Sequence, residues 1–317
     1  MHCKNRTDES IPFWLFPIPY LATKEIVRWQ MNILLGAPVW YGNRPFKRTI
    51  EEIYKLELDY FEFSLDYPLP DCMEEAERGE MKKLLEEFGL KIAFHSPLDI
   101  SVAHPRDEIA DASMTVLSRC MKFSAEFMPL SLYYNLHLHP KVSTYKLDDV
   151  REEIKQKGLG RWLDITKMAS EFGILVSVEN DLVPFEWSDL IFEVLSLSSS
   201  SDVYFTFDIG HAIMAEMTQP KTRIKVKDGN YLDYLKRWID KCGDKIRVVH
   251  LHDCSLTEKQ DHLSIGRGEL DFDAVFEVLK GTNCKYMVIE TFWRNKEKEE
   301  MTYEEMRKNV EFCRSYL

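Results

Sequence analysis

Short apolar runs alternate with amphipathic stretches eight times between Met31 and the end of the chain. Each run is rich in Val, Ile, Phe or Tyr and nearly continuous in apolar character, which is typical of parallel strands buried on both faces. We predict strands at residues 31–36, 58–64, 91–95, 132–139, 174–179, 203–208, 246–252 and 285–290.

The stretches between these runs have the spacing of amphipathic helices. Residues 74–88, for example, are charged on one side and end at Gly89, a residue type that favours helix ends. We predict helices at residues 49–58, 74–88, 107–128, 148–172, 186–197, 230–241, 271–280 and 301–316. Eight strand–helix repeats without a second compositional block predict an α/β fold, a single (β/α)8 TIM barrel over residues 31–317. An open doubly wound sheet is the alternative, but no GxGxxG follows the first strand.

Residues 1–30 do not continue this pattern. They contain three prolines and no sustained period, so we predict a short N-terminal extension, with Met31 as an alternative start of the protein. The apolar stretch 11–21 is too short and too interrupted to span a membrane, and it lacks a signal-peptide cleavage site.

Charge and cysteine content narrow the class of protein. Acidic residues outnumber basic ones 53 to 41, which argues mildly against non-specific binding to nucleic acid or to an anionic membrane. The seven cysteines are scattered, odd in number and without a CxxC pair, as expected of reduced intracellular thiols. We therefore expect a cytoplasmic protein without a membrane partner; a homo-oligomer is possible.

One imidazole or carboxylate stands at the end of each predicted strand from the third to the eighth. In such barrels the active site lies at the carboxyl ends of the strands, so these groups should converge in one mouth. Six ionisable groups there are costly to desolvate unless a cation or strong hydrogen bonds compensate them. Mixed His, Asp and Glu ligands suit Zn, Mn, Co or Fe(II), so the sequence predicts a divalent-metal site. The six residues are His95, His139, Glu179, Asp208, His250 and Glu290.

Seven ordered segments, FHSPLDIS, LHLHP, VSVEND, FDIGHA, VVHLHD, DHLSIGRGELDF and VIET, make residues 31–317 resemble the xylose-isomerase-like TIM barrels. That superfamily contains sugar and sugar-phosphate isomerases and epimerases, together with endonuclease IV, an apurinic-site nuclease. The resemblance implies a central Mn, Zn or Co ion on Glu179, Asp208, His250 and Glu290. In the isomerase and epimerase branch the two glutamates also act as acid and base, moving a proton through a metal-stabilised enediolate. His211 would contact a substrate hydroxyl.

The nuclease branch of the superfamily holds three zinc ions. The resemblance would place a second ion on His95, His139 and Glu179, and a third on His211 and His262. An aspartate completes the third site in the nuclease, whereas this sequence has Gln260 there. The DIGH segment and the SIGRGELDF loop look more like the isomerase branch. The leading hypothesis is thus a metal-dependent isomerase or epimerase of a sugar or sugar phosphate, with one metal ion expected and His95 and His139 as candidate ligands of a second. The alternative is an apurinic/apyrimidinic-site endonuclease, the one case with a nucleic-acid partner.

Two further residues are candidates for substrate binding. Glu62, in the second strand, either hydrogen-bonds a sugar hydroxyl or is a structural residue of the barrel. Arg267 and the glycines on either side of it either present a guanidinium and N–H groups to a substrate phosphate or form a simple turn.

Neighbours of the predicted ligands have expected supporting roles. His252 and Asp253 follow His250 closely and should orient it from outside the metal shell. His137 points the same way as His139 but one layer lower, so we expect it to be packed in the interior.

Overall fold

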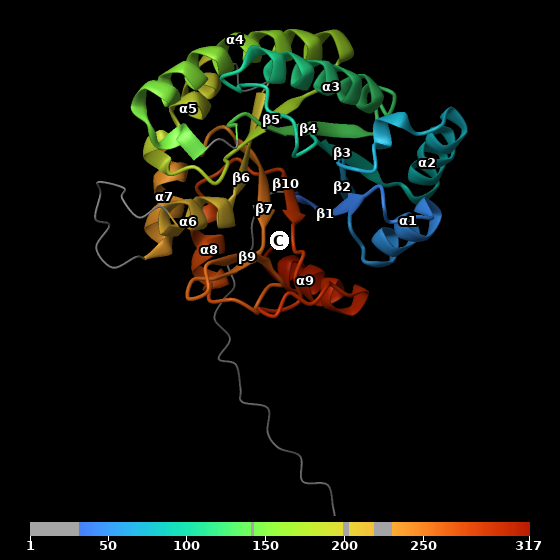
Figure 1. Ribbon diagram of the computed structural model, residues 1–317. Helices are drawn as coiled ribbons and strands as arrows, with labels where there is room; N and C mark the ends of the chain where they lie inside the picture. The colour runs from blue at the N-terminus through green and yellow to red at the C-terminus, as the bar shows by residue number, and fades with distance from the viewer. Residues whose placement is uncertain (1–31, 141–142, 199–202, 219–229) are drawn as a thin grey trace, which may run out of the picture.

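Eight parallel strands close into a barrel, with helices arranged around its outside (Figure 1). The structure, a computed structural model, describes residues 32–140, 143–198, 203–218 and 230–317. The strands follow one another around the barrel in chain order, and the last, β10, pairs with the first. This arrangement confirms the predicted (β/α)8 barrel. The barrel strands are β1 (Leu34–Trp40), β2 (Tyr60–Ser64), β3 (Lys91–His95), β4 (Ser131–His137), β5 (Val176–Glu179), β6 (Val203–Asp208), β7 (Ile246–Leu251) and β10 (Tyr286–Ile289).

Helices connect the strands and cover the outside of the barrel. α2 ends at Gly89, which has a left-handed φ of 67°, as its sequence predicted. α8 and α9 begin after Asp271 and Thr302, whose side chains accept hydrogen bonds from backbone N–H groups of the first turn. The α-helices are α1 (Phe46–Lys55), α2 (Glu75–Phe88), α3 (Asp107–Ala125), α4 (Asp148–Phe172), α5 (Asp189–Leu197), α6 (Ile209–Thr218), α7 (Tyr231–Cys242), α8 (Phe272–Leu279) and α9 (Tyr303–Tyr316), and the short 3-10 helices are η1 (Pro70–Cys72), η2 (Ser143–Lys146) and η3 (Phe185–Trp187).

Helix α6 and the hairpin of β8 and β9 were not predicted from the sequence, nor were the short helices η1 and η2. Helix α6 begins directly after β6, and it is apolar around most of its surface, so it lacks the period that marks an amphipathic helix. An antiparallel hairpin of β8 (Asp253–Ser255) and β9 (Gln260–Leu263) follows β7. The first strand also runs further than predicted, because residues 37–40 pair with β2.

Tyrosines fill the barrel interior near the amino ends of the strands. Tyr60 packs edge-on against Tyr133, with ring centroids 6.2 Å apart, and Tyr286 contacts both of them and Tyr204. A Cβ on Gly36 would lie 2.6 Å from the Tyr60 ring, so this strand position needs glycine. We call this group the tyrosine layer: Tyr60, Tyr133, Tyr204 and Tyr286 with Ala93, Val248 and Val288. It closes the barrel from below and leaves the carboxyl ends of the strands for the site.

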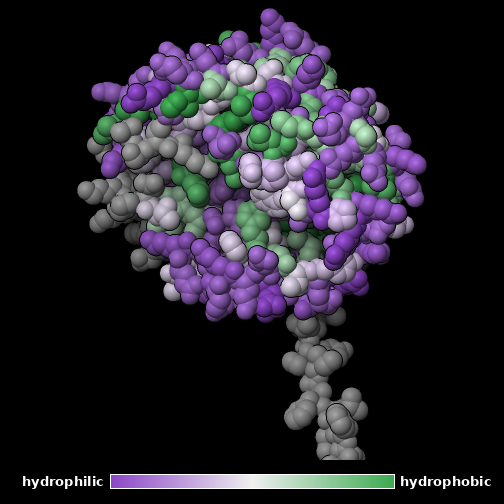
Figure 2. Space-filling model, turned by 45° about the vertical axis from the view of Figure 1, so that its right-hand side comes forward, coloured by the Kyte–Doolittle hydropathy of each residue, from purple (hydrophilic) through white to green (hydrophobic). Residues whose placement is uncertain are grey.

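The face drawn in Figure 2 is mainly hydrophilic, with smaller hydrophobic areas. In the part of the chain that the structure describes, no helix has both the length and the apolar character needed to cross a membrane. The predicted N-terminal extension, residues 1–30, lies outside the described residues.

Candidate metal centre and active site

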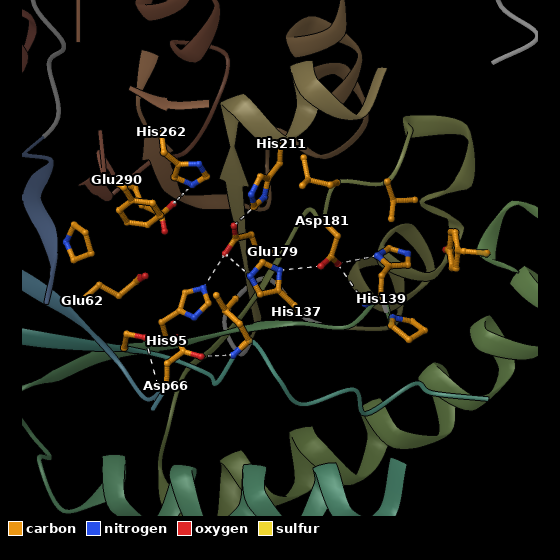
Figure 3. A pocket seen from close by; sticks show the side chains of 18 of the residues that line it. Glu62, Asp66, His95, His137, His139, Glu179, Asp181, His211, His262 and Glu290 are labelled. Atoms are coloured by element: carbon orange, nitrogen blue, oxygen red, sulfur yellow. Dashed lines mark hydrogen bonds and ion pairs between the residues drawn. The ribbon is translucent and has the colours of Figure 1, made fainter. Parts of the chain in front are cut away.

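A cavity of about 470 Å³ opens at the carboxyl ends of the strands. Its inner surface is lined by carboxylates and imidazoles, and Figure 3 shows Glu179 near its centre with imidazoles on several sides. This is where the active site of a (β/α)8 barrel is expected. The ionisable residues that line it are Glu62, Asp66, His95, His137, His139, Lys146, Glu179, Asp181, His211, His262 and Glu290.

The four residues predicted to hold the central metal lie together. Glu179 and Asp208 end β5 and β6, His250 lies in β7 opposite Asp208, and Glu290 directly follows β10. One potential ligand atom of each lies within 4.8 Å of those of the other three. Glu179, Asp208 and His250 are at most 1% exposed, so water has little access to the group.

The cluster has the chemistry that a divalent cation requires. Both ring nitrogens of His250 and Oε2 of Glu290 are buried without a hydrogen-bond partner of acceptable geometry. His250 Nδ1 nevertheless lies 2.7 Å from Glu290 Oε2 and 3.6 Å from Glu179 Oε1. Buried polar atoms without partners are rare and unfavourable, and a cation between His250 Nδ1 and Glu290 Oε2 would satisfy both atoms at once. One imidazole and three carboxylates are suitable ligands for Zn, Mn or Co, so the residues fit the predicted ion.

The carboxylates and imidazoles of this cluster stabilise each other's charges. Burial acts to raise the pKa of Glu179, but the charges of His137 and His250 hold that pKa well below its usual value. The pKa of Glu290 is likewise held low, against burial, by His250 and His262. Burial acts to lower the pKa of His250, whereas Glu290 and Glu179 raise it well above the ordinary value. A bound cation would take the place of these imidazole protons.

A second group of potential ligands meets at the opposite oxygen of Glu179. His95 Nε2 lies 3.4 Å and His137 Nε2 3.7 Å from Glu179 Oε2. As in the central cluster, one potential ligand atom of each of these three residues lies within 4.8 Å of those of the other two. The expectation that His137 is packed in the interior is therefore wrong: the β4–β5 register pairs it with Glu179, and it lines the cavity. His139 also lines the cavity but is not part of this group.

Asp181 links the two histidines of the β4 end. Its Oδ1 lies 2.9 Å from His137 Nδ1, and its Oδ2 lies 2.9 Å from His139 Nδ1 (Figure 3). Burial acts to raise the pKa of Asp181, but the two imidazoles lower it. Asp181 was not predicted as a site residue, although it stands two positions after Glu179 in the VEND segment.

The two candidates for a third metal or for substrate binding lie on the other side of the cavity. His211, in the first turn of α6, has Nδ1 2.9 Å from the backbone oxygen of Asn180 and 3.3 Å from Glu179 Oε1. His262 Nε2 lies 3.7 Å from Glu290 Oε2. His262 has a positive φ of 55°, an uncommon conformation for this residue type, and its ring is stacked on Phe292 with centroids 4.5 Å apart.

His252 positions Asp208 rather than His250, contrary to the expected role. The backbone N–H of His262 donates to His252 Nδ1 at 2.9 Å, so the imidazole proton must lie on Nε2. That nitrogen lies 3.2 Å from both carboxylate oxygens of Asp208 and donates to them. The ring packs so tightly on Gly210 that a Cβ there would lie 1.9 Å from His252 Cε1. Glycine is therefore required in the DIGH segment.

Asp253 also differs from expectation, and the segment around Arg267 forms a turn, the second of the two alternatives considered for it. Asp253 does not orient His250; its carboxylate accepts hydrogen bonds from the backbone N–H groups of Cys254, Gly266, Gly268 and Leu270. The N–H groups on either side of Arg267 are thus already paired. The Arg267 guanidinium donates to Glu305 at 2.8 Å and does not line the cavity. This arginine lowers the pKa of Glu305 to about 2.

Glu62 has a structural contact in the barrel and also faces the cavity. Its Oε2 accepts a hydrogen bond of 2.7 Å from the hydroxyl of Tyr133, a member of the tyrosine layer. Its Oε1 lies 3.4 Å from His250 Nε2, and the residue lines the cavity. Glu62 therefore connects the packed lower interior with the candidate metal-binding cluster above it.

Comparisons with known proteins extend these observations. An uncharacterized protein from Methanocaldococcus jannaschii is 25% identical over 215 residues, which cover 65% of this chain and 72% of the relative. A putative xylose isomerase from Rhodospirillum rubrum has a similar structure, with a TM-score of 0.71 at 15% identity over 90% of this chain and 99% of that one. D-psicose 3-epimerase with D-tagatose, from Clostridium cellulolyticum H10, has a TM-score of 0.65 at 14% identity, with 90% and 99% covered.

At these identities the solved structures support the fold alone. A family model described as a xylose isomerase-like TIM barrel matches residues 50–316, which is most of the chain and includes every ionisable residue of the cavity. The chain belongs to the xylose isomerase-like TIM barrel family.

Proposed function

We propose that the protein is a divalent-metal-dependent isomerase or epimerase of a sugar or sugar phosphate. The observation that carries this proposal is the position of Glu179 and Glu290. Both are in the metal-binding cluster with Asp208 and His250, and both line the cavity in which a substrate would bind. The fold that this chain shares with a sugar epimerase supports the same class of reaction.

The proposed reaction is a proton transfer at a carbon next to a carbonyl group. A divalent cation, when bound, polarises the substrate oxygens and lowers the barrier to an enediolate. One of the two glutamates removes the carbon-bound proton and the other returns a proton, as paired general bases and acids do. His211 and His95 contact Glu179, and His262 contacts Glu290, so each carboxylate is kept ionised and in place. The burial of the cluster limits the access of water.

The test is to strip the purified protein with a chelator and refill it with Mn, Co or Zn. We expect the refilled protein to interconvert at least one pair of sugars in a broad panel of ketoses, aldoses and their phosphates, and the stripped protein to be inactive. Failure with every sugar and every metal would count against the proposal. Elemental analysis should give between one and two metal ions per chain.

Endonuclease activity is the second candidate, and one observation favours it. In two further groups, one potential ligand atom of each residue lies within 4.8 Å of those of the others. These groups are His95–His137–Glu179 and Asp208–His252–His262–Glu290. The site therefore offers ligands for more than one ion. The second of these groups is weakened because His252 Nε2 carries a proton donated to Asp208. Lys146 is the only lysine or arginine among the described residues that line the cavity, which is unfavourable for a DNA phosphate backbone. Cleavage of an abasic duplex, with three metal ions per chain, would favour the nuclease.

A further inference from the structure

Glu62 is a buried carboxylate beside the candidate metal-binding cluster, and the proposed reaction gives it no task. It lies in β2, on the Glu290 side of the cavity and away from Asp181 (Figure 3). The residue is only 2% exposed. A buried carboxylate is unfavourable unless hydrogen-bond donors satisfy its oxygens. The donors that surround Glu62 therefore indicate its role.

The tyrosine layer supplies the first donor. The Tyr133 hydroxyl donates to Glu62 Oε2 at 2.7 Å. Because this bond uses the only hydroxyl proton of Tyr133, the Tyr60 hydroxyl, 3.3 Å away, is the donor in the contact between the two tyrosines. Both tyrosines are fully buried, so bulk water does not compete for these bonds. The hydrogen bonds therefore run in one direction, from Tyr60 through Tyr133 to Glu62, and hold the carboxylate in place.

His250 can supply the second donor, because its two ring nitrogens face different partners. Nδ1 lies 2.7 Å from Glu290 Oε2, 3.6 Å from Glu179 Oε1 and 3.9 Å from Asp208 Oδ2. Nε2 lies 3.4 Å from Glu62 Oε1. A cation held by the three carboxylates of the cluster would therefore meet Nδ1. A neutral imidazole that binds a metal through Nδ1 carries its proton on Nε2.

The contact between His250 and Glu62 is close to a hydrogen bond but is not yet one. Nε2 has no partner of acceptable geometry at 3.4 Å, whereas a good N–H···O bond is about 2.9 Å long. A shift of about 0.5 Å would form the bond. Histidines that bind a metal usually donate their other N–H to a carboxylate, a backbone oxygen or water, which fixes the ring and makes the metal-binding nitrogen more basic.

We propose that Glu62 is a positioning residue for the central metal ion: it accepts the Nε2–H of His250 and thereby fixes the ring with Nδ1 towards the ion. This role rests on the metal ion of the proposed function, but not on the reaction that the ion supports. Glu62 then has no oxygen left for a sugar hydroxyl, because Tyr133 and His250 engage both. Through Tyr133, the tyrosine layer contributes to metal affinity without supplying a ligand.

Metal affinity of the full-length protein is the first test. In competition with a chelator, Glu62→Met should raise the dissociation constant for Zn about 10–100-fold. Glu62→Gln should raise it less, because a neutral amide oxygen still accepts the N–H but binds it more weakly. If Glu62→Met does not fold, the smaller rise in Glu62→Gln decides. Glu305→Gln is the matched control: it changes another buried carboxylate, held by Arg267 outside the cavity, and should leave the constant unchanged.

The position of the His250 ring proton is the second test, and a purely structural role of Glu62 would not affect it. In Zn-loaded protein labelled with 15N-histidine, His250 should carry its proton on Nε2 and bind the metal through Nδ1. The resonance of that proton should lie downfield, as for an N–H that donates to a carboxylate, and should move upfield in Glu62→Met. His250→Gln assigns the signal.

Four results would overturn the role of Glu62. Unchanged Zn dissociation constants in both Glu62 variants would leave it a structural residue of the barrel. A His250 proton on Nδ1 would place the metal at Nε2 and make Glu62 a ligand. A tenfold rise in the KM of Glu62→Gln for a sugar, with unchanged metal affinity, would make Glu62 a substrate-binding residue. Failure of the wild type to bind any divalent metal would remove the ion itself, and with it both the proposed function and this role.

Discussion

The two ends of the barrel interior are filled by opposite kinds of residue. The tyrosine layer below is nearly all apolar in its contacts, and its one polar link upward is the hydrogen bond from Tyr133 to Glu62. The layer above contains Glu179, Asp208 and His250, all buried, and leaves both nitrogens of His250 unpartnered. Both layers are largely buried, but among the described residues buried imidazole nitrogens without a hydrogen-bond partner occur in the upper one. Stability should therefore depend mainly on the lower layer, and metal binding and catalysis on the upper one.

The largest expected effect is the loss of rate in Glu179→Gln and Glu290→Gln. Glutamine keeps one oxygen as a weak metal ligand but cannot accept a proton at neutral pH. If the two glutamates transfer protons, the rate at saturating metal should fall roughly 10²–10⁴-fold, measured as exchange of carbon-bound hydrogen with heavy water.

The controls for these variants are Asp208→Asn and His250→Gln, which change residues assigned to metal binding alone. Excess metal should largely restore their rates. Full rescue of both glutamine variants by added metal would instead leave the glutamates with a metal-holding role and remove the proton-transfer mechanism.

A smaller effect is expected when the support of one metal ligand is removed. His252→Phe keeps an aromatic ring against His262 but cannot donate a hydrogen bond to Asp208. Outer hydrogen bonds of this kind typically change metal affinity about 10–100-fold, so the metal dissociation constant should rise by that factor. Titration calorimetry measures it. An unchanged constant would show that Asp208 keeps its position without this imidazole; His104→Phe, outside the cavity, is the control.

Tyr133→Phe tests the link between the two layers. It removes the hydrogen bond to Glu62, a residue only 2% exposed, and leaves a buried carboxylate oxygen unpartnered. We expect the free energy of unfolding to fall by about 1–3 kcal/mol and the rate to fall with it. Val248→Ala, in the same layer but without a polar link, should reduce stability in denaturant titrations and leave the rate unchanged. If both variants lost stability and kept an unchanged rate, the two layers would be independent.

The smallest effect concerns Arg267, which the structure places outside the cavity. Arg267 holds the pKa of Glu305 at about 2, below the value of about 4.3 expected for an unfolded chain. Because the folded pKa is the lower one, this stabilisation is present above pH 4.3 and is lost as the pH falls towards 2. The melting temperature of Arg267→Met should therefore be a few degrees lower than that of the wild type at pH 6, and the gap should close in acid. A tenfold rise in the KM of Arg267→Met for a sugar phosphate would instead show that Arg267 binds the substrate.

The sequence predicted the barrel and the convergence of strand-end ionisable groups in its mouth because both depend on local pattern, whereas the choice of the four central residues came from the family resemblance. Apolar runs mark the strands, and the position of Glu179 or Asp208 at the end of a run places it in the mouth. What it could not predict depends on register and on contacts across the barrel. His137 reaches Glu179 because β4 and β5 are paired at those residues, which no spacing within β4 reveals. The roles of Asp181 and His252 likewise follow from partners on other strands.

The packing of His252 on Gly210 links two positions that are 42 residues apart in the chain. No side chain fits at position 210 while the imidazole is present, because even a methyl group would overlap the ring. The two sites should therefore change together during evolution: relatives with alanine or serine at the first should have lost the histidine at the second. In a family defined by short motifs, this pair would distinguish the lineages that retain the imidazole support beneath Asp208 from those that have replaced it.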